Sequence, residues 1–166
     1  MGMDKALLPF DGLPLAVHVA RVVKRAAGIA ILVGPPEKYG HLGFPVVPDV
    51  TAGAGPLAGI QSALLVSPAE WNLIVACDMP RVSEDFLRRL LDAATGDCLV
   101  PAGPSGRREP LCAVYHARCL PAIERALAAG VRRVMDALAA LETHEYPVED
   151  GTVFANCNTP EEWQHA

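Results

Sequence analysis

The stretch WNLIVACDMP, residues 71–80, decides the fold. It opens with a continuous run of apolar and β-branched residues, which predicts a buried strand over residues 71–78. Asp78 follows the run directly, and Pro80 stops the strand. A carboxylate at this position emerges at the edge of the sheet, partly shielded from water, where it is suited to hold a hard cation such as Mg²⁺. A helix cap or a salt-bridge partner is the alternative role for Asp78.

Strand and helix patterns alternate on both sides of this stretch. Apolar spacing predicts helices at residues 13–27, 55–66, 83–94, 121–129 and 132–141, with a last helix beginning at residue 159. Short apolar runs predict strands at residues 29–33, 44–49, 97–102, 110–116, 144–148 and 152–157. Because parallel strands need helical crossovers, we expect one α/β domain over residues 1–166. Its architecture is a three-layer α/β/α sandwich with a mainly parallel Rossmann-like sheet, to which residues 110–116 add an antiparallel piece.

Composition narrows the class of protein. The chain of 166 residues has 14 Lys and Arg against 19 Asp and Glu, so its net charge of -5 argues against a general nucleic-acid-binding role. No apolar run approaches the roughly 20 residues that cross a bilayer, and the first residues do not form a signal-peptide pattern. Five cysteines without a C-x-x-C pair predict small buried side chains in a reducing cytoplasm.

A glycine-rich loop follows one predicted strand, where α/β proteins bind ligands. In PDVTAGAGPLAGI, residues 48–60, Asp49 ends the strand and a helix begins near Pro56. Gly53, Gly55 and Gly59 permit close backbone approach, and the helix N-terminus offers free N–H groups to an anion. The spacing G-x-G-x-x-x-G is one residue longer than the dinucleotide fingerprint, so a dinucleotide site and a tight turn without a ligand both remain open.

Two further loops carry polar side chains. In FANCNTPEEW, residues 154–163, Asn156 and Asn158 alternate on an extended segment and point to one face, where their amides could orient a phosphate or a second substrate. Asn158 and Thr159 also fit the N-cap of a helix opened by proline. In GPSGRREPLCAVY, residues 103–115, Arg107 and Arg108 either reach an anionic substrate or form a solvated basic loop.

Four motifs in this order resemble a known family. They are MG-x-DKALL-P-x-x-G-x-PL, PD-x-x-x-G-x-GPLAGI-x-x-AL, CDMP and N-x-NTPEE, and they run from Gly2 to the final helix. Together they resemble the molybdenum cofactor guanylyltransferases of MobA type, within the nucleotidyltransferases of glycosyltransferase-A-like fold. The GPLAGI loop favours the guanylyl branch over the related cytidylyltransferases.

The resemblance implies transfer of GMP from Mg·GTP to the terminal phosphate of molybdopterin, with release of pyrophosphate, in the biosynthesis of molybdopterin guanine dinucleotide. It implies that Lys5 contacts the GTP phosphates and that Asp78 anchors Mg²⁺. Asp49 and the loop segment Gly55, Pro56, Leu57, Ala58 and Gly59 would bind the nucleotide, and Asn156 and Asn158 would face the metal or molybdopterin. Molybdoenzyme maturation chaperones are further expected partners.

The first residues depart from the family pattern. Members begin with a buried strand and a glycine-rich loop, LAGG-x-S-x-RMG, and Met1 and Gly2 fall where that loop ends. We therefore expect the first central strand and the phosphate loop to be missing from this sequence, and the 166-residue form to bind GTP poorly. Alternatives are a CTP-dependent molybdopterin cytidylyltransferase, a sugar-phosphate nucleotidyltransferase of the same fold, and a non-catalytic nucleotide-binding remnant.

Overall fold

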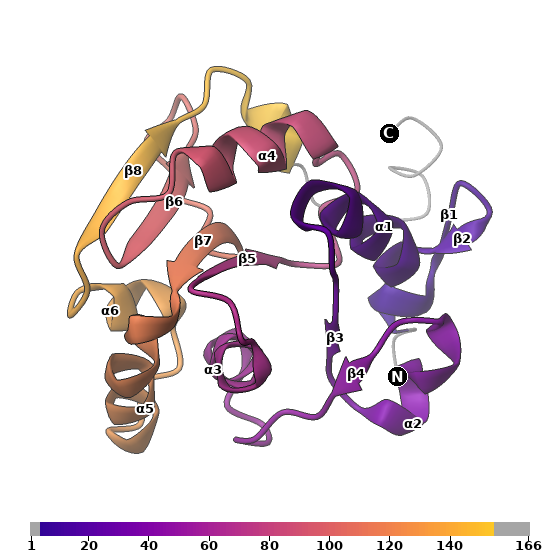
Figure 1. Cartoon of the computed structure of the whole chain (residues 1–166), viewed down its shortest axis with the longest axis horizontal. Helices are drawn as coiled ribbons and strands as arrows, with labels where there is room; N and C mark the ends of the chain where they lie inside the picture. The colour runs from indigo at the N-terminus through magenta and orange to yellow at the C-terminus, as the bar shows by residue number, and fades with distance from the viewer. Residues whose placement is uncertain (1–3, 155–166) are drawn as a thin grey trace.

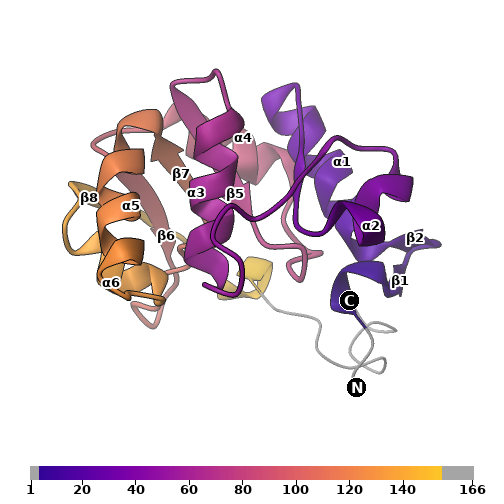
Figure 2. The ribbon, with the colours of Figure 1, turned by 90° about the horizontal axis from the view of Figure 1, so that it is seen from below.

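The computed structural model describes residues 4–154, in which helices cover both faces of a sheet (Figure 1). The helices α1 (Leu15–Ala27) and α4 (Glu84–Asp92) lie on one face. The helices α3 (Pro56–Val66), α5 (Leu120–Ala128) and α6 (Val134–Leu138) lie on the other, as the view from below shows (Figure 2). The expected α/β class and its alternation of elements are confirmed.

The main sheet is mixed. Its strands are β5 (Trp71–Val75), β6 (Cys98–Ala102), β7 (Cys112–His116) and β8 (Thr143–Pro147), in the order β5-β7-β6-β8. The strand β8 is parallel to β6, whereas β7 is antiparallel to both β5 and β6. The antiparallel piece expected at residues 110–116 is therefore confirmed.

The expectation of a mainly parallel sheet does not hold for these four strands. The cause is the connection from β6 to β7, which is a loop without a helix, so that β7 returns antiparallel beside β6. A second parallel pair, β3 (Leu32–Val33) with β4 (Val46–Val47), stands apart from this sheet. A short hairpin of β1 (Pro9–Phe10) and β2 (Leu13–Pro14) precedes α1.

The sheet separates two hydrophobic cores. Along β7, Cys112 and Val114 point into the core under α1 and α4, while Ala113 and Tyr115 point into the core under α3, α5 and α6. This alternation is the two-residue period of a strand that is covered on both faces. The Tyr115 hydroxyl donates a hydrogen bond of 2.8 Å to the Pro110 carbonyl, which satisfies its buried polar atom.

Local sequence signals explain the start of α4 and the end of α1. Ser83 caps α4 by accepting a hydrogen bond of 3.2 Å from the Phe86 N–H. Gly28 ends α1 with φ +82°, a conformation that glycine adopts without strain. Four-residue α2 (Pro36–Tyr39) was not expected, because one turn is too short to show an apolar period.

The described end of the chain also differs from expectation. The predicted strand at residues 152–157 begins instead as a 3-10 helix, Gly151–Phe154, and the remainder of that segment and the last predicted helix lie outside the described residues. The Asp150 Oδ1 accepts a hydrogen bond of 2.9 Å from the Thr152 N–H, which favours a turn over an extended segment.

The structure also bears on two predictions from composition, the burial of the cysteines and the length of apolar helices. Cys98, Cys112 and Cys119 are buried free thiols, and Cys77 is a half-buried one, as expected of small apolar side chains. Among residues 4–154 the helices are too short or too polar to cross a bilayer.

Candidate functional site

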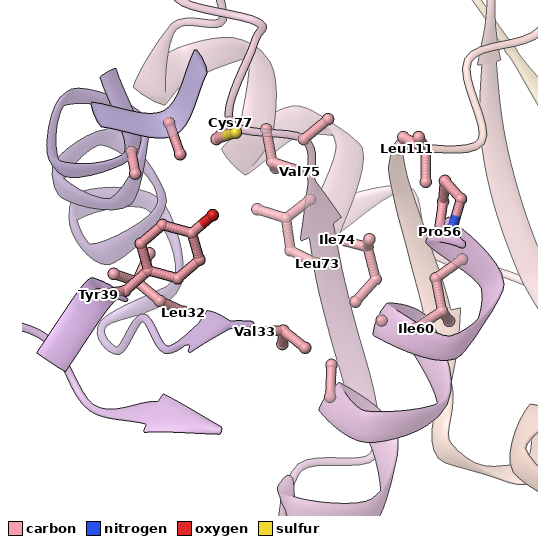
Figure 3. A pocket seen from close by; sticks show the side chains of 15 residues that line it. Leu32, Val33, Tyr39, Pro56, Ile60, Leu73, Ile74, Val75, Cys77 and Leu111 are labelled. Atoms are coloured by element: carbon pink, nitrogen blue, oxygen red, sulfur yellow. The ribbon is translucent and has the colours of Figure 1, made fainter. Parts of the chain in front are cut away.

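Three of the four sequence motifs meet at the carboxyl ends of β3 and β5, around an apolar cavity of about 340 Å³. Ala6 comes from the first motif, Pro56 and Gly59 from the glycine-rich loop, and Cys77 from the residues that follow β5. Tyr39 of α2 completes this end of the cavity, near Cys77 and across from Pro56 (Figure 3). The topology thus brings together segments that are far apart in the sequence.

Asp4 organises the first motif. It precedes the 3-10 helix Lys5–Leu7, and its Oδ1 accepts a hydrogen bond of 3.2 Å from the Ala6 N–H. Its Oδ2 accepts a hydrogen bond of 3.0 Å from the Tyr39 hydroxyl. One carboxylate therefore fixes the backbone that presents Lys5, whose side chain is exposed.

The Tyr39 hydroxyl is held in its protonated form. Burial and the hydrogen bond to Asp4 raise the pKa of Tyr39 to about 12, and the charge of Asp49 acts in the same direction. Because the folded state binds this proton more tightly than the unfolded state, the stability it contributes is complete below about pH 10 and is lost as the pH rises toward 12.

We therefore expect Tyr39→Phe to be less stable than the parent at pH 8, with a difference in Tm that shrinks between about pH 10 and 12. Thermal unfolding across this pH range checks the prediction, with Tyr146→Phe as a control. A parent-minus-variant absorbance titration that shows Tyr39 ionising near its ordinary pKa of about 10 would contradict it.

The glycine-rich loop between β4 and α3 is pinned by side chains of the helix that it precedes. The Val50 N–H donates to Ser62 Oγ at 2.9 Å, and the Thr51 hydroxyl donates to Gln61 Oε1 at 2.8 Å. Gly55 has φ +73° at the N-cap of α3, a conformation that a residue with a Cβ would adopt only with strain. The turn before α3 is thus preorganised.

Asp49 and α3 frame the outer side of this loop. Asp49 is exposed, and a Cβ placed on Gly59 would lie 3.8 Å from its Oδ1, so the carboxylate rests over the first turn of the helix. Leu57 and Ala58 are each 1% exposed and point into the core. Only their backbone atoms can reach a ligand, whereas Gly55 and Pro56, at the start of the helix, are exposed.

Asp78 lies in the turn after β5, beside two other ionisable groups. Burial raises the pKa of the Cys77 thiol to about 11, with the Asp78 charge as the second cause. Burial also raises the pKa of Glu109. The Arg107 guanidinium lowers this pKa, and the Asp78 charge raises it further. Asp78 is therefore close enough to the loop between β6 and β7 for its charge to act on Glu109, which is buried in that loop.

The two arginines of this loop are both paired with carboxylates. Arg107 Nε lies 2.8 Å from Glu109 Oε1, and Arg108 Nε lies 2.6 Å from Glu145 Oε1. The Arg107 side chain remains 73% exposed although it pairs with Glu109, whose charge environment it shares with Asp78. This arrangement is compatible with an anion near Asp78.

The donor set fits a metal that is shared with a substrate. Within residues 4–154 no three His, Cys, Asp or Glu side chains converge to hold an ion by themselves. Mg²⁺ is usually bound by one or two carboxylates, with phosphates and water completing its octahedron, and the partly exposed Asp78 beside Glu109 can supply this kind of ligand. Asn156 and Asn158, the other predicted residues, lie outside the described part of the chain.

Two contributors to this site carry no sequence signal. Tyr39 reaches Asp4 across 35 positions, and Glu109 reaches Asp78 only through the fold. A tyrosine in a one-turn helix and a glutamate in a polar loop both resemble ordinary surface residues in the sequence. Only the tertiary structure brings them to the site.

Comparison with known proteins points to one family. A family model described as MobA-like NTP transferase domain matches residues 1–144. A probable molybdenum cofactor guanylyltransferase of Pelotomaculum thermopropionicum is 36% identical over 169 residues, which cover 96% of this chain and 82% of the relative. The crystal structure of molybdopterin-guanine dinucleotide biosynthesis protein A from Archaeoglobus fulgidus is similar with a TM-score of 0.78 and 27% identity, over 99% of this chain and 89% of that one.

The fold extends to other nucleotidyltransferases. The crystal structure of 2-C-methyl-D-erythritol 4-phosphate cytidylyltransferase from Thermus thermophilus has a TM-score of 0.74 at 21% identity, over 98% of this chain and 91% of that one. At this identity the likeness concerns the fold alone.

Proposed function

This chain belongs to the MobA-like NTP transferase family, and on that premise we propose how its site transfers GMP from GTP to molybdopterin. The chain is a nucleotidyltransferase of molybdenum cofactor biosynthesis, a molybdenum cofactor guanylyltransferase. One observation carries this conclusion, namely the identity of 36% with a guanylyltransferase across 96% of this chain.

We assign the charged roles to Lys5 and Asp78. Lys5 is exposed on a 3-10 helix that Asp4 caps, at the carboxyl-end mouth of the cavity, where an ammonium group can contact GTP phosphates. Asp78 follows β5 at the same edge and is the ligand that we propose for Mg²⁺. When bound there, Mg²⁺ neutralises phosphate oxygens and favours departure of pyrophosphate.

The nucleoside part of GTP is assigned to the glycine-rich loop. Gly55 and Gly59 have no side chain to cover the first helical turn. Pro56 has no N–H, and the Ala58 N–H donates to the Gly55 carbonyl. The Leu57 N–H is therefore the donor of this turn that we propose for a guanine carbonyl or a ribose oxygen. The exposed carboxylate of Asp49 beside Gly59 can accept from guanine N–H groups or a ribose hydroxyl. Asn156 and Asn158 are proposed for the metal or molybdopterin side on the family pattern.

Transfer requires little proton chemistry from the protein. The acceptor phosphate of molybdopterin is already anionic at neutral pH, so it attacks the α-phosphorus without a strong general base. The rate enhancement then comes from positioning and from charge neutralisation. The preorganised loop before α3 and the 3-10 helix that Asp4 caps at Lys5 hold these groups in fixed positions, as an in-line displacement requires.

We also propose that the parallel pair β3-β4, together with β5, forms the Rossmann-like, nucleotide-binding half of a three-layer domain. The carboxyl ends of β3 and β5 line the cavity, as expected for ligand sites of open α/β sheets. The mixed part of the sheet, β7-β6-β8, supports that half from one side.

A transfer assay tests the proposed function. The full-length protein, incubated with Mg²⁺, molybdopterin and either GTP or CTP, is expected to give a guanylylated product by mass spectrometry and to release pyrophosphate with GTP. A preference for CTP would identify a cytidylyltransferase instead. Nucleotide binding without any product would indicate a non-catalytic protein.

A further inference from the structure

The one-turn helix α2 contacts the motif that presents Lys5. The Tyr39 hydroxyl donates a hydrogen bond of 3.0 Å to Asp4 Oδ2, and Lys38 Nζ lies 3.6 Å from the same oxygen. The Lys38 side chain is 56% exposed, so its ion pair contributes little, whereas the bond from the hydroxyl is directional and partly buried. Tyr39 is therefore the residue of α2 that fixes the Asp4 carboxylate.

The ring of Tyr39 is itself held at the end of β3. A Cβ placed on Gly34 would lie 2.6 Å from Tyr39 Cε2, so the ring packs directly against the glycine backbone. Gly34 is buried, and its N–H donates to the Val47 carbonyl at 2.8 Å. A glycine permits this close approach because it has no side chain. The β3-β4 pair thus sets the position of the Tyr39 hydroxyl.

The hydroxyl lies near three segments of the site. Burial is the main cause of the raised pKa of Tyr39, and Asp4, Cys77 and Asp49 each raise this pKa further, so all three are close to the hydroxyl. Figure 3 shows the hydroxyl pointing away from α2 on the side of Cys77. Tyr39 therefore lies beside the first motif, the glycine-rich loop and the residues that follow β5.

A short path of contacts joins Tyr39 to Lys5. Asp4 Oδ2 accepts from the Tyr39 hydroxyl, and Asp4 Oδ1 accepts a hydrogen bond of 3.2 Å from the Ala6 N–H. Lys5 stands between Asp4 and Ala6 on the 3-10 helix that Asp4 caps, and its C=O accepts from the Leu8 N–H at 3.1 Å. The orientation of the Asp4 carboxylate therefore sets the backbone from which the Lys5 side chain extends.

We propose that Tyr39 is a positioning residue for guanylyl transfer, which acts through Asp4 to hold Lys5 against the phosphates of GTP. This inference rests on the proposed function, because it needs the phosphate contact assigned to Lys5. Tyr39 does not have to touch the substrate. Without its hydroxyl, Asp4 Oδ2 keeps the exposed Lys38, which holds the carboxylate less tightly, and the Lys5 ammonium reaches the productive position less often.

A double-mutant cycle tests this role. In the full-length protein, Tyr39→Phe is expected to lower kcat/KM for GTP by about fivefold or more, because a misplaced Lys5 loses contacts in the transition state. In the Lys5→Gln background the same substitution is expected to change kcat/KM by less than about twofold, since the group that it positions is already absent. Tyr146→Phe in β8 removes another tyrosine hydroxyl and should leave kcat/KM at the parent value.

The cycle separates positioning from stability. A merely structural Tyr39 would lower the amount of folded enzyme by the same factor in both backgrounds. Equal losses in the two backgrounds, or no loss in either, would therefore overturn the proposal. All variants are assayed well below their Tm, because Tyr39→Phe is also expected to be less stable than the parent.

Amide exchange at Ala6 gives a readout that does not need transfer. Because the Ala6 N–H is donated to Asp4, Tyr39→Phe is expected to speed its exchange more than the exchange of the buried β6 amides, which follow global unfolding. An increase at Ala6 no larger than the increase in β6 would overturn the proposal. If the parent gives no guanylylated product, the proposed function fails, and the exchange at Ala6 still decides whether Tyr39 positions the backbone of Lys5.

Discussion

Asp78→Asn in the full-length enzyme is expected to lower Mg²⁺-dependent guanylyl transfer by about 10³-fold or more, since it removes the charge proposed to hold the metal against the phosphates. Asparagine has the same size as aspartate, and Asp78 lies in a partly exposed turn outside the hydrophobic cores. Tm should therefore change little. Initial rates at saturating GTP, with Mg²⁺ varied, measure the effect. Asp92→Asn on the exposed end of α4 is the matched control and should retain parent activity.

A second variant separates the metal role of Asp78 from the charge of its neighbour. Glu109→Gln removes the neighbouring carboxylate and leaves Asp78 unchanged. If transfer survives Asp78→Asn but is lost in Glu109→Gln, the metal role moves from Asp78 to Glu109. Unchanged turnover in both variants would place the metal elsewhere.

Lys5→Gln is expected to reduce kcat/KM for GTP by about 10- to 100-fold, the loss of one charge-assisted contact of about 1.5–3 kcal/mol. The substitution leaves the Asp4 cap and its bond to Tyr39 in place, so the 3-10 helix should persist. Lys5→Arg should recover part of the activity, because the charge is retained with a different shape. Lys24→Gln in the last turn of α1 serves as the control.

Rates measured over a range of GTP concentrations check the role of Lys5. Equal kcat/KM in the parent and Lys5→Gln would remove Lys5 from the phosphate contacts. A loss that Lys24→Gln reproduces would point to net charge rather than to a local contact.

The strong periodic segments made most of the fold predictable. Helix α1 and strand β5 could be predicted because a 13-residue amphipathic helix and a continuous apolar strand each have an unambiguous sequence pattern. The mixture of parallel and antiparallel pairs in the sheet was harder to predict from the sequence. The antiparallel direction of β7 was expected, but its place between β5 and β6, which makes two of the three strand pairs antiparallel, depends on tertiary packing that no local pattern encodes.

The candidate site was predictable in part. Lys5, the glycine-rich loop and Asp78 were predicted from motifs, and the structure brings these motifs together at one end of the same apolar cavity. The side-chain burial of Leu57 and Ala58 could not be read from the GPLAG motif, because it depends on how α3 packs against β6 and α5. Tyr39 and Glu109 act through contacts that are distant in sequence, for which composition and spacing carry no signal.

A crystal structure of the full-length protein with GTP and Mg²⁺ tests the location of the site most directly. The account predicts an Asp78 carboxylate oxygen at about 2.0–2.1 Å from Mg²⁺. It also predicts the nucleoside against the turn at Gly55 and Gly59, with the phosphates toward Lys5. A nucleotide bound away from this edge, for example in the polar depression between α4 and β8, with no metal at Asp78, would contradict it.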